Sequence, residues 1–127
     1  MTLTDYLRET AGRRFEWGRC DCVTFVCDWI VSQRGVDPAE PFRGQYSSGL
    51  KAAENLAPNG GLAGSVAKFF ERAGLKTTDE PVAGDVGVVL MRRPTCAIYL
   101  GRDMWAAKGR RGVTISVAKP LAAWSVG

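Results

Sequence analysis

A cysteine at the start of a predicted helix is the residue best placed to do chemistry. Residues 15–25 read Phe-Glu-Trp-Gly-Arg-Cys-Asp-Cys-Val-Thr-Phe, and the second cysteine, Cys22, follows Asp21, a residue type that suits a helix N-cap. A thiol in the first turn of a helix lies near backbone N–H groups without intrahelical partners and near the positive end of the helix dipole. Both stabilise a thiolate. The pattern therefore indicates a potential nucleophile at Cys22.

The usual partner of such a cysteine is missing, because the chain contains no histidine. Acyl transfer through a thioester needs a group that takes the thiol proton and returns it to the leaving amine, and histidine does so because its pKa lies near neutrality. An aspartate, with an ordinary pKa of about 4, needs strong desolvation to replace it. We therefore expect Asp21 to cap the helix, and Asp85 and Asp103 to form turns beside glycines.

The cysteines also allow a metal site as an alternative. The chain has enough soft ligands for tetrahedral zinc or an iron–sulfur cluster, namely Cys20, Cys22, Cys27 and Cys96. The C-x-C-x4-C spacing differs from that of zinc ribbons, and Cys27 lies five residues after Cys22, so the two do not share one helix face. We expect Cys27 and Cys96 to be buried apolar residues. The main hypothesis includes no cofactor.

The hydrophobic pattern predicts helices in the first part of the chain and strands in the second. The predicted helices cover 4–10, 22 to the stop signal at Gly35, 48–56 and 65–73. The predicted strands cover 86–91, 96–100, 104–107 and 113–117. This order predicts an α+β fold, in which N-terminal helices precede a small antiparallel sheet that packs on the helix carrying Cys22. No repeat interrupts the pattern, so we expect a single domain over residues 1–127.

An apolar stripe on the second helix indicates where the Cys22 side chain points. Val23, Val26, Trp29 and Ile30 recur at intervals of three and four residues, and Cys22 belongs to the same stripe. We therefore expect the thiol to face the protein core rather than the solvent.

Composition limits the classes of partner. The net charge is +4, and the basic residues gather in short clusters, with Lys108-Gly-Arg-Arg-Gly112 predicted to be a basic hairpin tip. Aromatic residues do not alternate with these clusters as a nucleic-acid stacking platform requires, so no specific nucleic-acid binding is expected. No apolar run is long enough to span a membrane, and the N-terminus lacks the pattern of a signal peptide. We expect the chain to be made in the bacterial cytoplasm.

Several motifs resemble those of one known family. Residues 17–22, Trp-Gly-Arg-Cys-Asp-Cys, resemble the Trp-Gly-x-x-Asp-Cys signature of the NlpC-like papain-fold cysteine peptidases, which cleave peptide stems of bacterial peptidoglycan. Residues 84–86, Gly-Asp-Val, and 97–101, Ala-Ile-Tyr-Leu-Gly, are similar to two of the family's core strands. The resemblance implies a papain-like, NlpC-type fold with Cys22 as the nucleophile position. It also makes Trp17, Gly18 and Asp21 candidate binding residues. The alternative is structural: Trp17 fills the core, Gly18 forms a turn and Asp21 caps the helix.

The catalytic positions depart from the family's pattern. When the Ile-Tyr-Leu-Gly segment is used as the anchor, the family's catalytic histidine falls on Thr95 and its third polar residue on or near Ala106. A hydroxyl is not a useful base near neutral pH, and alanine has no polar side-chain atom. Loss of one member of such a coupled set lowers the rate by several powers of ten. The resemblance therefore implies a pseudoenzyme.

A broader resemblance suggests a biological setting. Small NlpC-like proteins that lack the histidines and end in an Ala-x-x-Trp type tail look like products of the tail genes of long-tailed phages and gene-transfer particles, and this chain has Leu-Ala-Ala-Trp at 121–124. The resemblance implies a virion protein of the tail tip, with other tail proteins and peptidoglycan as partners. Trp124 and Tyr46 are expected to be packing residues or interface anchors. One alternative is an active cell-wall peptidase or amidase that pairs Cys22 with a partner other than histidine. The other is a tail connector protein stabilised by a metal or iron–sulfur site of the four cysteines.

Overall fold

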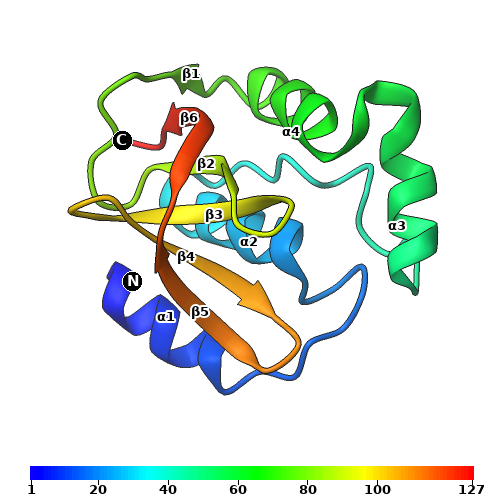
Figure 1. The fold of residues 1–127 in the computed structure, drawn as a ribbon, viewed down its shortest axis with the longest axis horizontal. Coiled ribbons are helices and arrows are strands. Elements are labelled where there is room, and N and C mark those ends of the chain that lie inside the picture. Colours follow the sequence, from blue (N-terminus) through cyan, green and yellow to red (C-terminus); the bar gives the residue numbers. More distant parts are fainter.

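The protein has an α+β fold in which N-terminal helices pack on a six-stranded antiparallel sheet. The computed structural model describes all 127 residues. The helical elements are α1 (Leu3–Ala11), α2 (Cys22–Arg34), α3 (Gly49–Leu56), the short 3-10 turn η1 (Ala57–Asn59) and α4 (Gly61–Arg72). The strands are β1 (Lys76–Thr77), β2 (Val86–Leu90), β3 (Pro94–Gly101), β4 (Met104–Gly109), β5 (Gly112–Val117) and β6 (Lys119–Ser125) (Figure 1). The coarse fold prediction is confirmed.

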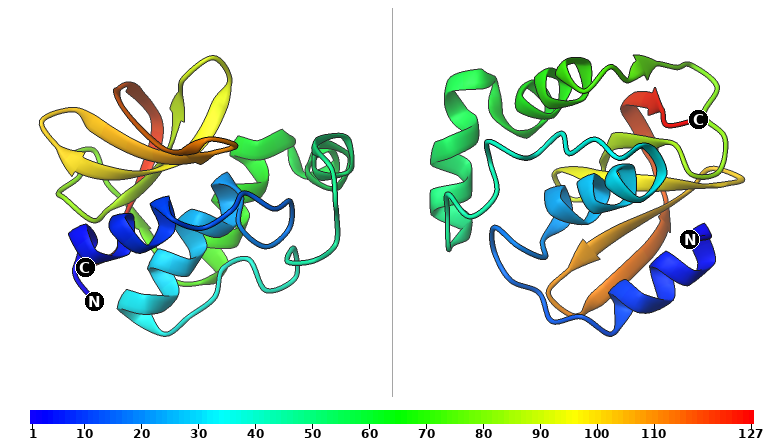
Figure 2. Two further views of the ribbon diagram at one scale, coloured as in Figure 1. Left: turned by 90° about the horizontal axis from the view of Figure 1, so that it is seen from below. Right: turned by 180° about the vertical axis from the view of Figure 1, so that it is seen from behind.

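The helices lie mainly on one side of the sheet. The left view of Figure 2 shows the sheet as a curved layer above α1 and α2, with α3 at one end of the molecule. The strand order is β1-β6-β2-β3-β4-β5, and every neighbouring pair is antiparallel. The main core fills the space between the two layers, and α2 supplies several of its most buried side chains, including Phe25, Val26 and Ile30.

Local signals define the ends of α2 as predicted. Asp21 is the N-cap and forms a capping box with Thr24, while Gly35 ends the helix in the left-handed conformation at φ 70°. The other helices also form where expected, except that α4 begins at Gly61 rather than at 65. This earlier start is possible because Gly64 has no Cβ, which would collide with the carbonyl oxygen of Asn59.

All four predicted strands form, and β1 and β6 were not predicted. β6 contains Pro120 and lies between β1 and β2, where Trp124 pairs with Val86 on one side and with Thr77 on the other. The Trp124 side chain is buried and makes an edge-to-face contact with Phe70, their ring centroids being 5.0 Å apart. Trp124 is therefore a packing residue, and β6 depends on neighbours far away in the sequence.

The outer face of the sheet carries a second, smaller core. It is built around Trp105 and contains Ala107 of the same strand and residues of three other strands: Val89, Ala97 and Ala123. A Cβ on Gly87 would lie 3.0 Å from the Trp105 ring and 2.6 Å from the Ala122 carbonyl oxygen. The absence of a side chain at Gly87 therefore allows the indole to lie across β2.

The strands β3 and β4 separate toward one end of the sheet. Residues 94–98 of β3 all pair with β2, whereas pairing with β4 involves only Ile98, Tyr99 and Gly101. Residues 94–97 consequently have no partner on β4. Figure 1 shows the two strands diverging away from the hairpin that joins them. The resulting gap opens near the N-terminus of α2, where the Cys22 side chain lies.

Candidate functional site

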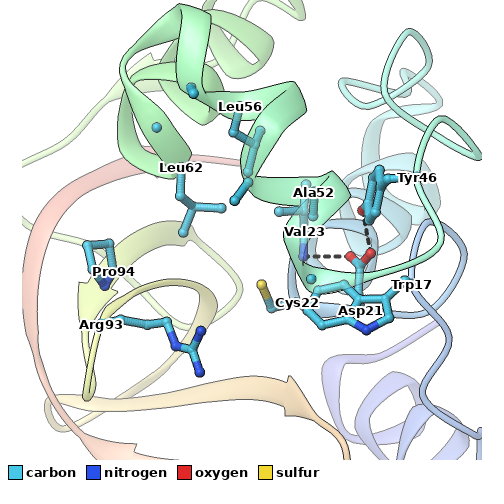
Figure 3. Close-up of a pocket in the computed structure, with 14 residues that line it drawn as sticks. Trp17, Asp21, Cys22, Val23, Tyr46, Ala52, Leu56, Leu62, Arg93 and Pro94 are labelled. Carbon is cyan, nitrogen blue, oxygen red and sulfur yellow. Dashed lines mark hydrogen bonds between the residues drawn. The ribbon is translucent and has the colours of Figure 1, made fainter.

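Cys22 lies in a groove with an apolar end and a basic end. The apolar end, of about 270 Å³, is bounded by α3, η1 and the start of α4, and its lining includes Tyr46, Ala52, Leu56 and Leu62. The basic end, of about 430 Å³, includes Phe15, Thr95, Lys108 and Arg110. The two cavities form one groove because they share lining residues: Trp17, Cys22, Gly49, Arg93 and Pro94. Figure 3 shows the Cys22 sulfur pointing into the space beside Arg93 and Leu62.

The wall formed by the N-terminus of α2 is organised around the buried carboxylate of Asp21. Its oxygens accept hydrogen bonds from the backbone N–H groups of Val23 and Thr24, both at 3.0 Å, and of Gly18 at 2.8 Å. The phenol O–H of Tyr46 donates a further short hydrogen bond to the same carboxylate (Figure 3). Asp21 thus caps α2 and also binds the loops that contain Gly18 and Tyr46. Because these donors occupy the carboxylate oxygens, the oxygens are not free to accept the proton of Cys22.

The thiol of Cys22 is held in its protonated form. Burial is the main cause that raises its pKa to about 11, and the negative charge of Asp21 raises it further. Backbone N–H groups, including that of Cys96, only partly offset these effects. The helix N-terminus therefore does not produce the stabilised thiolate that the sequence pattern suggested, because burial disfavours the charged form of the thiol and the negative charge of the Asp21 cap adds to this effect. The Cys22 side chain packs against the core and also lines the groove.

The positions matched to the catalytic histidine and to the third polar residue of the NlpC-like peptidases, Thr95 and Ala106, lie in different surroundings. Thr95 is at the basic end of the groove, and its hydroxyl donates to the carbonyl oxygen of Arg93 at 2.9 Å. Ala106 is completely buried on β4, opposite Ile98. Neither side chain can take the proton of Cys22 at neutral pH.

The two other candidate aspartates lie outside the groove and support turns, as predicted. Asp85 is buried, and its carboxylate accepts from the backbone N–H groups of Val82 at 2.9 Å and Val126 at 3.0 Å. Asp103 belongs to the β3–β4 hairpin and has a positive φ of 61°. Asp21 is consequently the only carboxylate among the residues that line the groove.

Trp17 and Gly18 differ in their relation to the groove. The half-buried indole of Trp17 forms a wall common to both ends and makes an edge-to-face contact with Phe15, with 4.8 Å between centroids. Gly18 has a φ of 83°, and a Cβ there would lie 2.7 Å from the carbonyl oxygen of Tyr46. Trp17 is thus available to a ligand, whereas Gly18 is required by the turn that precedes Asp21.

The four cysteines are free and do not form a ligand set. Cys27 and Cys96 are completely buried, as predicted, and burial raises the pKa of both thiols. No group of three or more cysteine, aspartate or glutamate side chains is close enough together to hold a metal ion. The arrangement gives no support to the alternative of a metal site built from Cys20, Cys22, Cys27 and Cys96.

The predicted basic hairpin tip at residues 108–112 forms between β4 and β5, where Gly109 pairs with Gly112. Lys108, near the end of β4, is buried, and its ammonium group donates to the carbonyl oxygens of Thr10 at 3.0 Å and Arg13 at 2.5 Å. Arg110 of this hairpin and Arg93, which precedes β3, line the groove and form no ion pair or side-chain hydrogen bond. Neither arginine was expected to be a site residue, because only the fold brings their segments together.

Comparison with protein families places the chain in one family. The family described as Domain of unknown function (DUF6950) matches residues 1–126, and the chain belongs to it. No curated protein and no solved structure matches the chain. None of the helices combines the length and hydrophobicity needed to cross a membrane. Any function must therefore be argued from the groove and its residues.

Proposed function

We propose that this DUF6950 domain is a catalytically depleted NlpC-like, papain-fold domain whose groove binds a ligand without cleaving it. In this proposal it is a structural or peptidoglycan-facing component of the tail tip of a phage or gene-transfer particle. The observation that carries the proposal is the state of Cys22, a protonated thiol in a groove whose only carboxylate is occupied by backbone N–H groups and by the hydroxyl groups of Thr24 and Tyr46.

Two features support binding rather than catalysis. A cysteine nucleophile needs a partner that removes its proton, and the matched positions Thr95 and Ala106 supply none. The groove nevertheless combines an apolar end, a wall made by Trp17 and a basic end. Ligand sites in proteins typically have this combination of a concave apolar surface and a few polar groups. A protein that had lost catalysis but kept binding would retain this combination.

In this proposal the tail setting rests on the resemblance of the motifs at 17–22, 84–86 and 97–101 to those of NlpC-like proteins, together with the α+β order of helices and strands. Partners in this proposal are other tail proteins and peptidoglycan, and the location is the virion tail. Two measurements test it: co-sedimentation of the purified protein with peptidoglycan sacculi, and mass spectrometry of purified particles. Absence from the particles together with no binding to sacculi would contradict the setting.

A thiol-labelling experiment tests the pseudoenzyme. A pKa near 11 instead of 9.0 lowers the thiolate fraction at neutral pH by about 100-fold. We expect alkylation of Cys22 to be slow at neutral pH and to accelerate with pH without a plateau below about 9, and we expect no turnover of peptidoglycan fragments. The Cys22→Ala variant supplies the background from the three buried cysteines.

The second candidate is an active hydrolase, favoured by the position of the sulfur in an accessible groove. It predicts rapid labelling that levels off below the pKa of a free cysteine, and fragment turnover that disappears in Cys22→Ala. That pair of results would defeat the pseudoenzyme proposal.

A further inference from the structure

The apolar end of the groove offers little hydrogen bonding to a ligand. Its walls include Ala52, Leu56 and Leu62, and its volume is about 270 Å³. The carboxylate of Asp21 and the hydroxyl of Tyr46 also border it, but the hydroxyl donates to the carboxylate, which is further bound by backbone N–H groups. A sugar or a peptide group buried here would give up hydrogen bonds to water without equivalent partners, which costs free energy. The surroundings therefore favour a hydrocarbon group.

The basic end of the groove carries positive charge without a counter-charge. Lys108 lines it and is buried, and its ammonium group is bound to two carbonyl oxygens but to no carboxylate. The exposed side chains of Arg93 and Arg110 line the same end without ion pairs, and no acidic side chain lines it. A buried cation without an anionic partner is unfavourable, so a bound anion would stabilise this end.

The two ends meet beside Cys22. Arg93 lines both of them, so a positive charge stands where the apolar end opens into the basic end. Figure 3 shows the Arg93 guanidinium group and the Leu62 side chain on opposite sides of the space into which the Cys22 sulfur points. A ligand that fills both ends is therefore apolar at one end and negatively charged at the other.

We propose that the groove binds a small amphiphilic anion, namely a single alkyl chain with a carboxylate or phosphate head group. The alkyl chain fills the cavity bounded by α3 and the start of α4, and the head group lies beside Arg93 and Arg110. The inference rests on the proposed function in one respect, namely that the groove holds its ligand without cleaving it.

Isothermal titration calorimetry tests the head group. The probes are octanoate, octyl phosphate, octanol and octylammonium, each below the concentration at which it forms micelles. We expect at least one of the two anions to bind about tenfold more tightly than octanol, because octanol lacks the charge that the arginines recognise. Octylammonium should bind more weakly than octanol. The tighter of the two anions identifies the head group.

Chain length and a filled cavity test the apolar end. Octanoate has two methylene groups more than hexanoate and should bind about tenfold more tightly, because both are buried. Ala53 is exposed and lines the apolar end, so Ala53→Trp should reduce the affinity for octanoate at least to that for hexanoate. The matched control is Ala63→Trp, at an exposed position of α4 that lines neither end.

Variants of the arginines test the basic end. Arg93→Gln combined with Arg110→Gln should reduce the affinity for the tighter anion to that for octanol and leave the affinity for octanol unchanged. Arg92→Gln is the matched control, because Arg92 is an exposed neighbour that does not line the groove. Circular dichroism verifies that each variant is folded.

Five outcomes would each overturn the inference: equal binding of both anions and octanol, no gain from hexanoate to octanoate, equal losses in a variant and its control, tighter binding of a peptidoglycan stem peptide than of the anions, or no binding of any amphiphile. These outcomes are separate from a failure of the proposed function, which would appear as Cys22-dependent turnover of peptidoglycan fragments.

Discussion

The two walls of the groove differ in how completely their polar groups are satisfied. On the α2 wall, the buried Asp21 binds three backbone N–H groups and the hydroxyl of Tyr46. On the opposite wall, β3 and β4 separate, and Arg93 and Arg110 have no side-chain partners. On the α2 wall the Asp21 carboxylate is paired with donors of the protein, whereas on the opposite wall the two arginine side chains have no partner.

The segment at residues 17–22 has structural roles that do not depend on a reactive Cys22. The Trp-Gly-x-x-Asp-Cys segment supplies the cap of α2, the turn at Gly18 and the anchor for Tyr46, so its residues stabilise the fold whether or not Cys22 reacts. Binding capacity then depends on the opposite wall. Four measurements on variants can break or sharpen this comparison.

The largest expected effect is that of Asp21→Ala. Loss of an N-cap costs about 1 kcal/mol, and leaving the buried Tyr46 hydroxyl and Gly18 N–H unpaired adds about 1 to 3 kcal/mol each. We expect the free energy of unfolding, measured by urea denaturation, to fall by about 3 kcal/mol or more. The matched control, Asp79→Ala, removes an exposed carboxylate without hydrogen bonds and should change stability little. A loss below about 1 kcal/mol for Asp21→Ala would contradict its central role.

Lys108→Met should have the next largest effect. The side chain keeps its apolar length, but the carbonyl oxygens of Thr10 and Arg13 lose their donor. We expect a loss of about 2 kcal/mol in the free energy of unfolding, because the Arg13 carbonyl loses its donor and the C-terminal end of α1 loses a neighbouring positive charge, while the Thr10 carbonyl keeps the backbone N–H of Arg13. Lys119→Met, at an exposed position of β6, is the control. Equal effects of the two changes would show that the buried ammonium group has no special role.

The stability of the protein should fall at alkaline pH through Cys22. Its pKa is raised from 9.0 to about 11 in the folded protein, so above pH 9.0 the unfolded chain releases this proton more readily than the folded one. The free energy of unfolding therefore decreases between these two values. The loss between about pH 8 and about pH 10 should be smaller in Cys22→Ala than in the unmodified protein. Identical losses would contradict the raised pKa.

The smallest expected effect on stability is that of the two groove arginines. Arg93→Gln and Arg110→Gln remove exposed charges that make no ion pair, so each should change the free energy of unfolding by less than about 0.5 kcal/mol. A loss comparable to that of Lys108→Met would mean that Arg93 and Arg110 stabilise the fold. The two walls of the groove would then not differ in this respect.

The local elements were predictable from the sequence, whereas the nonlocal ones were not. The ends of α2 follow from Asp21 and Gly35, whose effects act within one turn of the helix. The strand β6 was missed because Pro120 weakens the strand pattern, and its pairing partners in β1 and β2 are distant in the chain. Strand formation depends more on such neighbours than helix formation does.

The candidate site divides in the same way. Cys22, Asp21 and Trp17 were identified because they lie within one short motif, and the structure places all three in the groove. Arg93 and Arg110 were not, since one precedes β3 and the other follows β4. Their proximity results from the divergence of these strands, which no short sequence pattern reports.

By itself, the sequence determined the order of helices and strands, the cap at Asp21 and the absence of any imidazole, because these depend on residue type and local spacing. The tertiary structure decided that the Cys22 thiol stays protonated, that Lys108 is buried and that two free arginines share an opening. Burial, charge and strand pairing depend on groups that are close in space but distant along the chain, and only the packed fold brings them together.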